Sequence, residues 1–386
     1  MSIDASETDL PLVGLRILDF SQYLAGPSCA LRLADLGAEV IKIERPQGGD
    51  PCRQLVLADQ KLGPDSLLFH TINRGKKSVT ADLKIPSDLN AVKTLIRSAD
   101  VMIHNFRPGV MARLGLDVEA VSTLNPTLIQ AMITGYGTEG PWRDKPGQDL
   151  LVQSRSGLLW LSGCEMDAPV PIGVSITDIA AGQHLSQGIL AALLRRERTG
   201  KGAVIEVSLL ASAMDLQFEA FTSYLNAAPV MPKRSMVSGA NVLIAAPYGI
   251  YPTADGYLAL AMGSITELAS LLSIAVPPSW YDPESAYHKR DEIKSILRDT
   301  LILHSTSHWL AKLEPAGIWC AEVLDWPQLE QCGALDHLHV IQHVGIGENQ
   351  IRTTTCPIKI DHKNLGNDVG APQLGADTSF YLDKFQ

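Results

Sequence analysis

The chain has 386 residues, of which 46% are hydrophobic and 19% charged, and this excludes a disordered protein and favours two globular domains. Its formal net charge of -10 argues against a general nucleic-acid-binding surface, because Lys and Arg are not in excess. The six cysteines are scattered, without the paired spacing of zinc sites or disulfide frameworks. No apolar run approaches the roughly 18 residues of a membrane span, and the polar N-terminus is unlike a signal peptide. We therefore expect a cytoplasmic protein with no metal site and no nucleic-acid or membrane partner.

Strands and helices alternate along the N-terminal part of the chain. The strands are expected at 14–20, 38–43, 100–104, 128–134 and 203–209, and the helices at 27–36, 89–98 and from 179 onward. This alternation predicts an α/β fold with a Rossmann-like, mostly parallel sheet that helices cover on both faces. The loop SQYLAGP after the first strand lacks the G-x-G-x-x-G fingerprint, so a nicotinamide cofactor is not expected.

The hydrophobic pattern changes beyond residue 226. A segment with two prolines leads into a β-hairpin that is expected to turn at Asp255-Gly256. Helices are expected around 264–272, 291–303 and 307–313, and one continuous helix before the change, at 211–226. The sequence therefore predicts a large α/β domain at 1–225, completed by the C-terminal segment 330–386, and a small α+β domain with linkers at 226–329.

Asp178 lies where a short extended run of small and β-branched residues meets a helix, whose apolar residues recur from Ile179 onward. The local pattern by itself favours a helix cap, because Asp is among the best N-cap residues. The alternative is a nucleophile, because a carboxylate that helix N–H groups and the helix dipole keep ionised can attack an activated acyl group. Spacing alone leaves both interpretations open.

Cations cluster in the segment NRGKKSVTADLK, residues 73–84. Composition by itself favours a solvated basic surface there, and a phosphate-binding rim is the alternative. Of the histidines, His184 lies within the helix after Asp178 and is expected to be packed. His104 ends a strand. A polar side chain there most often satisfies backbone groups, and the alternative is that His104 approaches the ligand region.

The motifs of this chain, taken in order, resemble those of the family III CoA-transferases, the formyl-CoA and carnitine CoA-transferase type, over nearly the whole length. They are GLRILDFSQYLAGP, DLGAEVIKIERPQGGDPCR, NRGKKSVTADLK, NFRPGVMARLGL, NPTLIQAMITGYGTEGPW and the segment from Asp178 to GILAALLRRERTGKG. The resemblance implies an enzyme whose substrates are acyl-CoA and small carboxylic acids. It also implies that no cofactor is permanently bound, that coenzyme A enters as part of the substrate, and that the chain forms an interlocked homodimer.

The same resemblance assigns roles to individual residues. Asp178 takes the position of the catalytic aspartate, which attacks the acyl-CoA thioester to give a mixed anhydride and then an aspartyl-CoA thioester. Leu24 and Ala25 are expected near the reacting acyl group, and Gly135 is expected to allow close backbone approach to the ligand. The cations expected near the CoA phosphates are Arg45, Lys84 and Arg113, with Arg107, Lys76 and Arg74 as weaker candidates.

Three departures from relatives bear on specificity. Gly147-Gln148-Asp149 stands where the racemase branch has G-H-D, and Gln cannot exchange a proton near neutral pH, so a transferase is favoured. Leu24 replaces a Gln of the formyl- and oxalyl-specific relatives, and SGANVLIAAPYG lacks their run of glycines. Formyl and oxalate specificity are therefore not expected. A 2-methylacyl-CoA racemase or isomerase and a non-catalytic CoA-binding protein remain as alternatives, and Arg155 and Arg234 are candidates to meet a second carboxylate.

Overall fold

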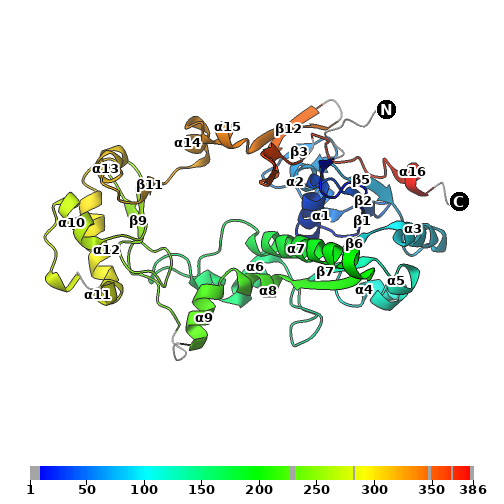
Figure 1. Ribbon diagram of the computed structural model, residues 1–386, viewed down its shortest axis with the longest axis horizontal. Coiled ribbons are helices and arrows are strands. Elements are labelled where there is room, and N and C mark those ends of the chain that lie inside the picture. The colour runs from blue at the N-terminus through cyan, green and yellow to red at the C-terminus, as the bar shows by residue number, and fades with distance from the viewer. Residues whose placement is uncertain (1–8, 227–230, 281–282, 347–348, 367, 383–386) are drawn as a thin grey trace. The chain divides into compact units, whose positions relative to one another are not determined.

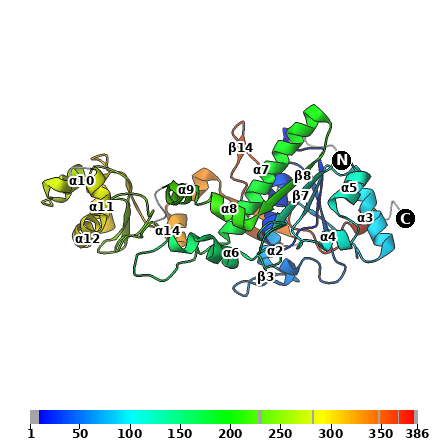
Figure 2. The ribbon, with the colours of Figure 1, turned by 90° about the horizontal axis from the view of Figure 1, so that it is seen from below.

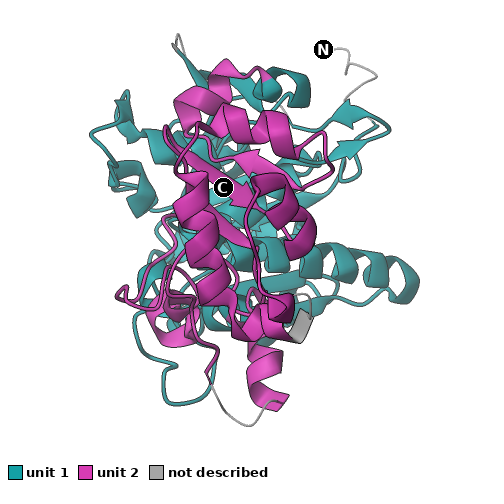
Figure 3. Cartoon of the chain, turned by 90° about the vertical axis from the view of Figure 1, so that its left-hand side faces the viewer, with its two compact units in different colours: residues 1–152, 175–213, 334–386 teal, residues 153–174, 214–333 magenta. Residues whose placement is uncertain are grey.

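The computed structural model describes residues 9–226, 231–280, 283–346, 349–366 and 368–382. The chain divides into two compact units, which Figure 3 distinguishes by colour. Unit 1 comprises residues 1–152, 175–213 and 334–386, and unit 2 comprises residues 153–174 and 214–333. The domain boundaries expected from the sequence, with the smaller domain at 226–329, stay a prediction.

Unit 1 is built around a six-stranded parallel sheet with the order β5-β2-β1-β6-β7-β8 (Figures 1 and 2). Its strands are β1 (Arg16–Asp19), β2 (Glu39–Glu44), β5 (Lys77–Thr80), β6 (Val101–His104), β7 (Ile129–Thr134) and β8 (Ala203–Ser208). The chain enters the sheet at β1, adds β2 and β5 on one side, and then adds β6, β7 and β8 on the other. This is the strand order of Rossmann folds, and the Rossmann-like sheet predicted from the sequence is confirmed.

Helices cover both faces of this sheet, as its apolar strands require. Side chains alternate along a strand, so Ile17 and Leu18 of β1 enter different hydrophobic clusters. Ile17 packs in the cluster that α1 (Ala25–Asp35) and α7 (Ile176–Thr199) share with the sheet. Leu18 packs in the cluster that contains α3 (Pro86–Ser98) and α5 (Val118–Leu124).

The C-terminal segment covers the β5 edge of the sheet. The backbone N–H of Ser78 donates to Asp377 Oδ2 at 2.9 Å, and the N–H of Thr80 donates to Thr378 Oγ1 at 2.9 Å. Both acceptors lie at the start of α16 (Thr378–Leu382). The exposed backbone groups of an edge strand favour pairing with other chains, so this cover protects the sheet on that side.

Unit 2 is an α+β arrangement around a three-stranded antiparallel sheet in the order β11-β10-β9. The predicted hairpin is confirmed, since the Thr253 N–H donates to the Gly256 carbonyl at 2.9 Å between β9 and β10. The strands are β9 (Gly249–Pro252), β10 (Tyr257–Leu260) and β11 (Cys320–Glu322), and the helices packed with them are α10 (Ile265–Leu272), α11 (Pro283–His288), α12 (Arg290–Leu301) and α13 (Thr306–Leu313).

The single helix predicted at 211–226 is two helices, α8 (Leu209–Asp215) and α9 (Phe218–Asn226). The break falls at Leu216 and Gln217, and the Gln217 side-chain amide donates to the Ser156 carbonyl at 3.0 Å. The small and aromatic composition of 211–226 gave no sign of this break, because composition does not reveal a hydrogen bond to a residue far away in the sequence.

The remaining elements are short. They are β3 (Lys61–Leu62), β4 (Asp65–Ser66), α2 (Leu67–Ile72), α4 (Val110–Arg113), α6 (Asp149–Ser156), α14 (Trp326–Gln331), α15 (Ala334–Leu338), β12 (Ile341–Ile346), β13 (Asn349–Thr354), β14 (Lys359–Ile360) and β15 (Lys363–Asn364). None of the helices in the described part of the chain combines the length and apolar character that a bilayer span requires.

Candidate active site

The carboxyl ends of the parallel strands bring most of the predicted site residues to one edge of the unit 1 sheet. Leu24 and Ala25 follow β1, Arg45 follows β2, Lys84 follows β5, Arg107 and Arg113 follow β6, and Gly135 follows β7. The strand order reverses direction between β1 and β6. Open α/β sheets bind ligands outside the strand carboxyl ends at such a reversal, so the topology puts a binding crevice at this edge.

The loop after β1 is held in a fixed shape at this reversal. Asn105, which follows β6, accepts from the Gln22 N–H at 2.8 Å and donates to the Gln22 carbonyl at 2.7 Å. The Tyr23 N–H donates to Asp50 Oδ1 at 3.2 Å, and Tyr23 takes a left-handed conformation with φ of 65°. A non-glycine residue keeps such a conformation only where its surroundings enforce it. Residues that follow β6 and β2 thus hold the loop on either side, and this fixes where Leu24 and Ala25 begin α1.

The N-terminus of α7 packs against the N-terminus of α1. A Cβ atom on Gly182 would lie 2.7 Å from the Ala25 carbonyl oxygen and would also collide with Ser28, so only glycine permits this approach. Asp178 lies four residues before Gly182, hence one turn earlier on the same helix face. This places Asp178 at the corner where Leu24 and Ala25 begin α1.

Asp178 is not the N-cap that the local sequence favoured. The N-cap is Ser175, and Asp178 is the third residue of α7, because Ile176 and Thr177 are already helical. Burial, and secondly the nearby Asp149 carboxylate, raise the pKa of Asp178 from 3.8 to about 7. No hydrogen bond from residues that the structure describes offsets these effects. The expectation of a carboxylate held ionised by helix N–H groups is therefore wrong, and the group is protonated more readily than an ordinary Asp.

Asp149, the first residue of α6, occupies the position at the α7 N-terminus that the sequence had suggested for Asp178. Its Oδ1 accepts from both the N–H and the Oγ1–H of Thr177, each at 2.8 Å. Residues 149 and 177 are 28 positions apart, and no local pattern connects them. The sequence drew attention to Asp149 only as part of Gly147-Gln148-Asp149, which carries no sign of a contact with Thr177.

The pKa of Asp178 gives a prediction for stability. Between the ordinary value of 3.8 and about 7, the folded protein keeps a proton on Asp178 that the unfolded chain releases. Stability is therefore expected to fall as the pH rises through this window. At high pH we expect Asp178→Asn to exceed the wild-type protein in free energy of unfolding by roughly 2 kcal/mol, after discounting for solvent screening, and to match it in acid. Urea unfolding near pH 8 and pH 4 measures this, and an equal difference at both values would contradict it.

Four of the predicted cations are exposed at the carboxyl edge. The Arg45 guanidinium makes one long bond to the Gly49 carbonyl, at 3.4 Å. The side chains of Lys84, Arg107 and Arg113 are exposed and make no hydrogen bond or ion pair with residues in the described ranges. All four can therefore turn to an anionic ligand without giving up a strong internal partner.

Lys76 and Arg74 are buried and committed elsewhere. The Lys76 ammonium donates to Asp19 Oδ2, the Pro27 carbonyl and Asn73 Oδ1, each at 2.9 Å. Arg74 makes a two-pronged ion pair with Asp35. Removing either cation would take the closest ion-pair partner from a buried carboxylate, so both leave the set of residues proposed to hold CoA phosphates. The basic segment 73–84 is thus neither a solvated surface nor a uniform rim.

Gly135 makes its close backbone approach to the chain itself. A Cβ atom on Gly135 would lie 2.6 Å from the Cα atom of Gly147. The two glycines therefore bring the loop after β7 against the residues that precede α6. Because Asp149 follows Gly147 by two positions, this contact helps to fix where the Asp149 carboxylate stands.

Comparison with known proteins identifies the class of this chain. It matches the model of CoA-transferase family III over residues 12–378. The chain belongs to this family. It is 35% identical to the succinyl-CoA:glutarate CoA-transferase of Mus musculus, over 80% of this chain and 71% of that protein. It is 33% identical to the acetyl-CoA:oxalate CoA-transferase of Acetobacter aceti, over 82% of this chain and 81% of that one.

A solved structure confirms the fold of this CoA-transferase. Rv3272 from Mycobacterium tuberculosis, in an orthorhombic crystal form, superposes with a TM-score of 0.84 at 30% identity. The match covers 96% of this chain and 99% of that one. The resemblance drawn from the ordered motifs is therefore confirmed, and so is the assignment of the chain as a CoA-transferase.

The other candidate side chains of the CoA-transferase are His184, His104 and Arg234. His184 Nδ1 pairs with Ser212 Oγ at 2.9 Å, in agreement with the packed role expected of it. Burial lowers the pKa of His104 to about 4, so this imidazole is neutral near neutral pH. The buried guanidinium of Arg234 donates to the carbonyl oxygens of Ser162 and Ala168, at 2.9 and 3.2 Å, so it is not available to a second substrate carboxylate.

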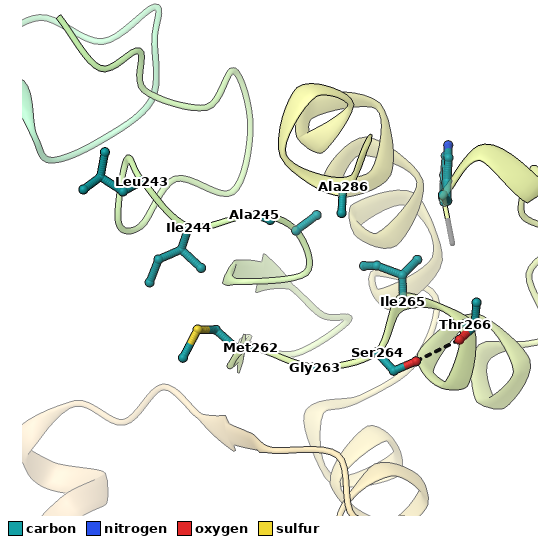
Figure 4. A pocket seen from close by; sticks show the side chains of 11 residues that line it. Leu243, Ile244, Ala245, Met262, Gly263, Ser264, Ile265, Thr266 and Ala286 are labelled. Carbon is teal, nitrogen blue, oxygen red and sulfur yellow. Dashed lines mark hydrogen bonds between the residues drawn. The ribbon is translucent and has the colours of Figure 1, made fainter. Parts of the chain in front are cut away.

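Unit 2 of the CoA-transferase contains an apolar pocket of about 540 Å³ (Figure 4). Leu243, Ile244, Met262 and Ile265 contribute to its walls, and the hydroxyls of Ser264 and Thr266 bond to each other at 2.8 Å. Leu243 and Ile244 belong to the stretch that lacks the glycine run of formyl-specific relatives. The pocket has room for a hydrocarbon group. Trp280 also lines it, and the indole N–H of this residue has no hydrogen-bond partner in the described part of the chain.

Proposed function

We propose that this family III CoA-transferase moves CoA from an acyl-CoA donor to a carboxylic acid acceptor, with Asp178 as the nucleophile. The observation that carries the proposal is the position of Asp178. Its carboxylate is half-buried in the first turn of α7, beside the strand-order reversal of a sheet whose carboxyl edge bears four exposed cations. A nucleophile and an anion-binding rim at one edge are what a reaction of CoA thioesters requires.

The proposed reaction is a series of nucleophilic substitutions at acyl carbons. It needs no reactant besides the acyl-CoA donor and the acceptor acid. An Asp178 oxygen attacks the thioester carbonyl, the C–S bond breaks, and CoA leaves as the thiolate, giving a mixed anhydride. The thiolate then attacks the Asp178 carbonyl carbon, which forms an aspartyl-CoA thioester and releases the donor acid as its carboxylate. The acceptor carboxylate attacks the carbonyl carbon of this thioester, which releases the CoA thiolate and gives a second mixed anhydride. The thiolate then attacks the acceptor carbonyl of that anhydride, which forms the new acyl-CoA and releases the Asp178 carboxylate.

The environment of Asp178 suits the first of these steps. With a pKa of about 7, the carboxylate is substantially ionised near neutral pH, and it carries little stabilisation by hydrogen bonds. A poorly stabilised anion is the more reactive nucleophile. The oxyanion that develops on the substrate can be received by N–H groups at the start of α1, whose N-cap Leu24 supplies no side-chain hydrogen bond.

Arg45 and Lys84 are proposed to bind CoA phosphates, with Arg113 and Arg107 beside them. We expect Arg45→Ala and Lys84→Ala each to raise KM for the acyl-CoA donor by about 10-fold, with little change in kcat, because an exposed charged hydrogen bond is lost from binding and not from chemistry. Lys201→Ala is the matched control, since this exposed lysine precedes β8 and therefore lies at the amino ends of the strands, away from the proposed CoA site. An unchanged KM in both variants would remove these cations from the CoA site.

The carboxylic acids to test first are dicarboxylic. Two relatives of this chain are named for succinyl-CoA with glutarate and for acetyl-CoA with oxalate. Both names support a short dicarboxylic acid as the acceptor, and the first supports succinyl-CoA as the donor. The absence of the glycine run makes glutarate a better candidate acceptor than oxalate. Arg155 remains a proposed contact for a second carboxylate.

The homodimer expected from the family is supported by one exposed apolar helix face. Phe218, Phe221 and Leu225 of α9 stand at helical spacing and are all exposed. An apolar face of this kind favours burial against a second copy of the chain. Light scattering of the purified protein measures the oligomeric state. The interlocked form of the dimer and the cytoplasmic location stay predictions.

Trapping the acyl enzyme tests the proposed function directly. The protein is incubated with succinyl-CoA and hydroxylamine, and the peptide that contains Asp178 is analysed by mass spectrometry. We expect a hydroxamate on Asp178, because hydroxylamine intercepts both the anhydride and the aspartyl thioester. A hydroxamate on another residue would contradict the mechanism. Exchange of the α-proton of a 2-methylacyl-CoA with solvent deuterium, without any acceptor acid, would indicate the racemase alternative instead.

A further inference from the structure

The acceptor for an N–H group in the first turn of α7 is a carboxylate from another helix, that of Asp149 in α6. Every α-helix leaves its first N–H groups without an intrahelical partner, and an N-cap side chain commonly satisfies one of them. In α7 the N-cap Ser175 makes no such bond. The N–H of Thr177 instead donates to Asp149 Oδ1 at 2.8 Å, and the Thr177 hydroxyl donates to the same oxygen at 2.8 Å.

This arrangement changes what is left for Asp178, the next residue along α7. A carboxylate that accepts hydrogen bonds from N–H groups is stabilised as the anion and becomes a weaker base and nucleophile. Because Asp149 takes the Thr177 N–H, that donor is not available to Asp178. No residue in the described part of the chain donates to the Asp178 carboxylate, which is consistent with the raised pKa of this group.

Asp149 is also the charged neighbour that acts on Asp178. The two carboxylates repel each other, and this repulsion adds to the effect of burial on the Asp178 pKa. The α1 residues that pack against α7 at Gly182 are the uncharged Ala25 and Ser28, together with Cys29, whose thiol pKa is raised by burial so that it is neutral. No nearby cation is therefore supplied by α1 to oppose the effect of Asp149.

We propose that Asp149 is a positioning residue of the CoA-transfer reaction, which occupies the Thr177 N–H and thereby keeps the Asp178 carboxylate free of helix hydrogen bonds. This inference rests on the proposed role of Asp178 as the nucleophile. Asp149 itself touches neither substrate nor reacting atoms in this scheme. Its place is set by the Gly135–Gly147 backbone contact, which joins the loop after β7 to the start of α6.

Two substitutions separate the charge of Asp149 from its hydrogen bonds. Asp149→Asn keeps an oxygen that accepts from Thr177 and removes the charge. We expect it to retain the wild-type unfolding midpoint and KM for the acyl-CoA donor, and to move the acidic limb of the kcat/KM profile down by about one pH unit. Asp149→Ala also leaves the Thr177 N–H without its acceptor, so that the Asp178 side chain can rotate to accept from it. We expect kcat to fall by about 100-fold with KM little changed.

Asp144→Asn is the matched control, because this carboxylate precedes α6 by five residues, is largely exposed, and has a single weak ion pair with Arg143, at 4.0 Å. This variant removes one negative charge from the segment just before α6, and it should leave the pH dependence of kcat/KM unchanged. An Asp149→Ala enzyme that folds and keeps the kcat of Asp149→Asn would overturn the proposal, because only the alanine variant loses the hydrogen bonds to Thr177. Should Asp149→Ala fail to fold, Asp149→Leu, which fills more of the space and also accepts no hydrogen bond, takes its place in this comparison.

Failure of this inference can be told apart from failure of the proposed function. Hydroxylamine trapping on the wild-type enzyme reports on Asp178 alone. If Asp178 forms the hydroxamate and the Asp149 variants behave like Asp144→Asn, only the role of Asp149 is overturned. If another residue is trapped, the proposed function falls, and the role of Asp149 falls with it.

Discussion

Asp178→Asn is expected to abolish CoA transfer, with kcat reduced on the order of 10⁴-fold or more, while KM for the acyl-CoA donor stays near the wild-type value. An amide oxygen cannot form the anhydride, and the cations proposed to bind CoA lie on other elements of the same edge. Steady-state kinetics with succinyl-CoA and glutarate measure both quantities. Direct titration with CoA, followed by calorimetry, checks that the variant still binds.

Asp178→Glu sharpens this prediction. It keeps the carboxylate and lengthens the side chain by one methylene, in a corner where Gly182 already packs directly on Ala25. We expect kcat to fall by about 100-fold, because a displaced nucleophile loses the geometry of attack. An Asp178→Asn enzyme that retained a tenth of the wild-type kcat would exclude covalent catalysis by this residue. A non-catalytic CoA-binding protein would instead show normal CoA binding and no transfer in the wild-type form.

Lys76→Met is expected to lower the free energy of unfolding by roughly 3–5 kcal/mol, which is the largest stability effect that we predict for a single substitution. The Lys76 ammonium is buried between Asp19, Asn73 and the Pro27 carbonyl. Removing it leaves the carboxylate of Asp19 at the end of β1 with Lys42 as its remaining cation, at 3.9 Å. Chemical unfolding followed by circular dichroism measures the loss.

The adjacent lysine supplies the control for this experiment. Lys77 is exposed at the start of β5, so Lys77→Met should change stability by less than about 0.5 kcal/mol. A double variant, Lys76→Met with Asp19→Asn, should recover part of the loss, because the buried negative charge that Lys76 balanced is then also removed. If Lys76→Met were as stable as the wild type and raised KM for acyl-CoA, Lys76 would belong to the CoA site after all.

Lys76 is part of a buried ionic network that shapes the carboxyl edge. Lys42 pairs with Asp50 at 2.9 Å, and Asp50 in turn holds the Tyr23 N–H in the loop after β1. Arg53 joins Glu44 and Asp65 at 2.7 Å each, which ties the segment after β2 to the strand end. The network is costly to break because each group is buried among its partners, and it fixes the loop after β1 and the segment after β2, which carries Arg45.

Much of this protein followed from the order of residues alone. The alternation of apolar strands with helices predicted the parallel sheet, since period and length reveal an element wherever one face must be buried. The ordered motifs indicated the CoA-transferase family and singled out Asp178. The same resemblance named Arg45, Lys84 and Arg113 as cations near the CoA phosphates. The sheet brings them to one edge, because in a parallel sheet all carboxyl ends meet there.

The tertiary structure alone decided which of these side chains are available and in what state. Lys76 and Lys84 are both cations of one segment, yet the first is buried against Asp19 and the second is exposed. Whether a charge meets water or a partner depends on chain segments far apart in sequence, and no local pattern contains that information. For the same reason the sequence did not show that Asp178 accepts no helix N–H and has a raised pKa. The Thr177 N–H donates instead to Asp149, which lies 28 residues earlier in the chain.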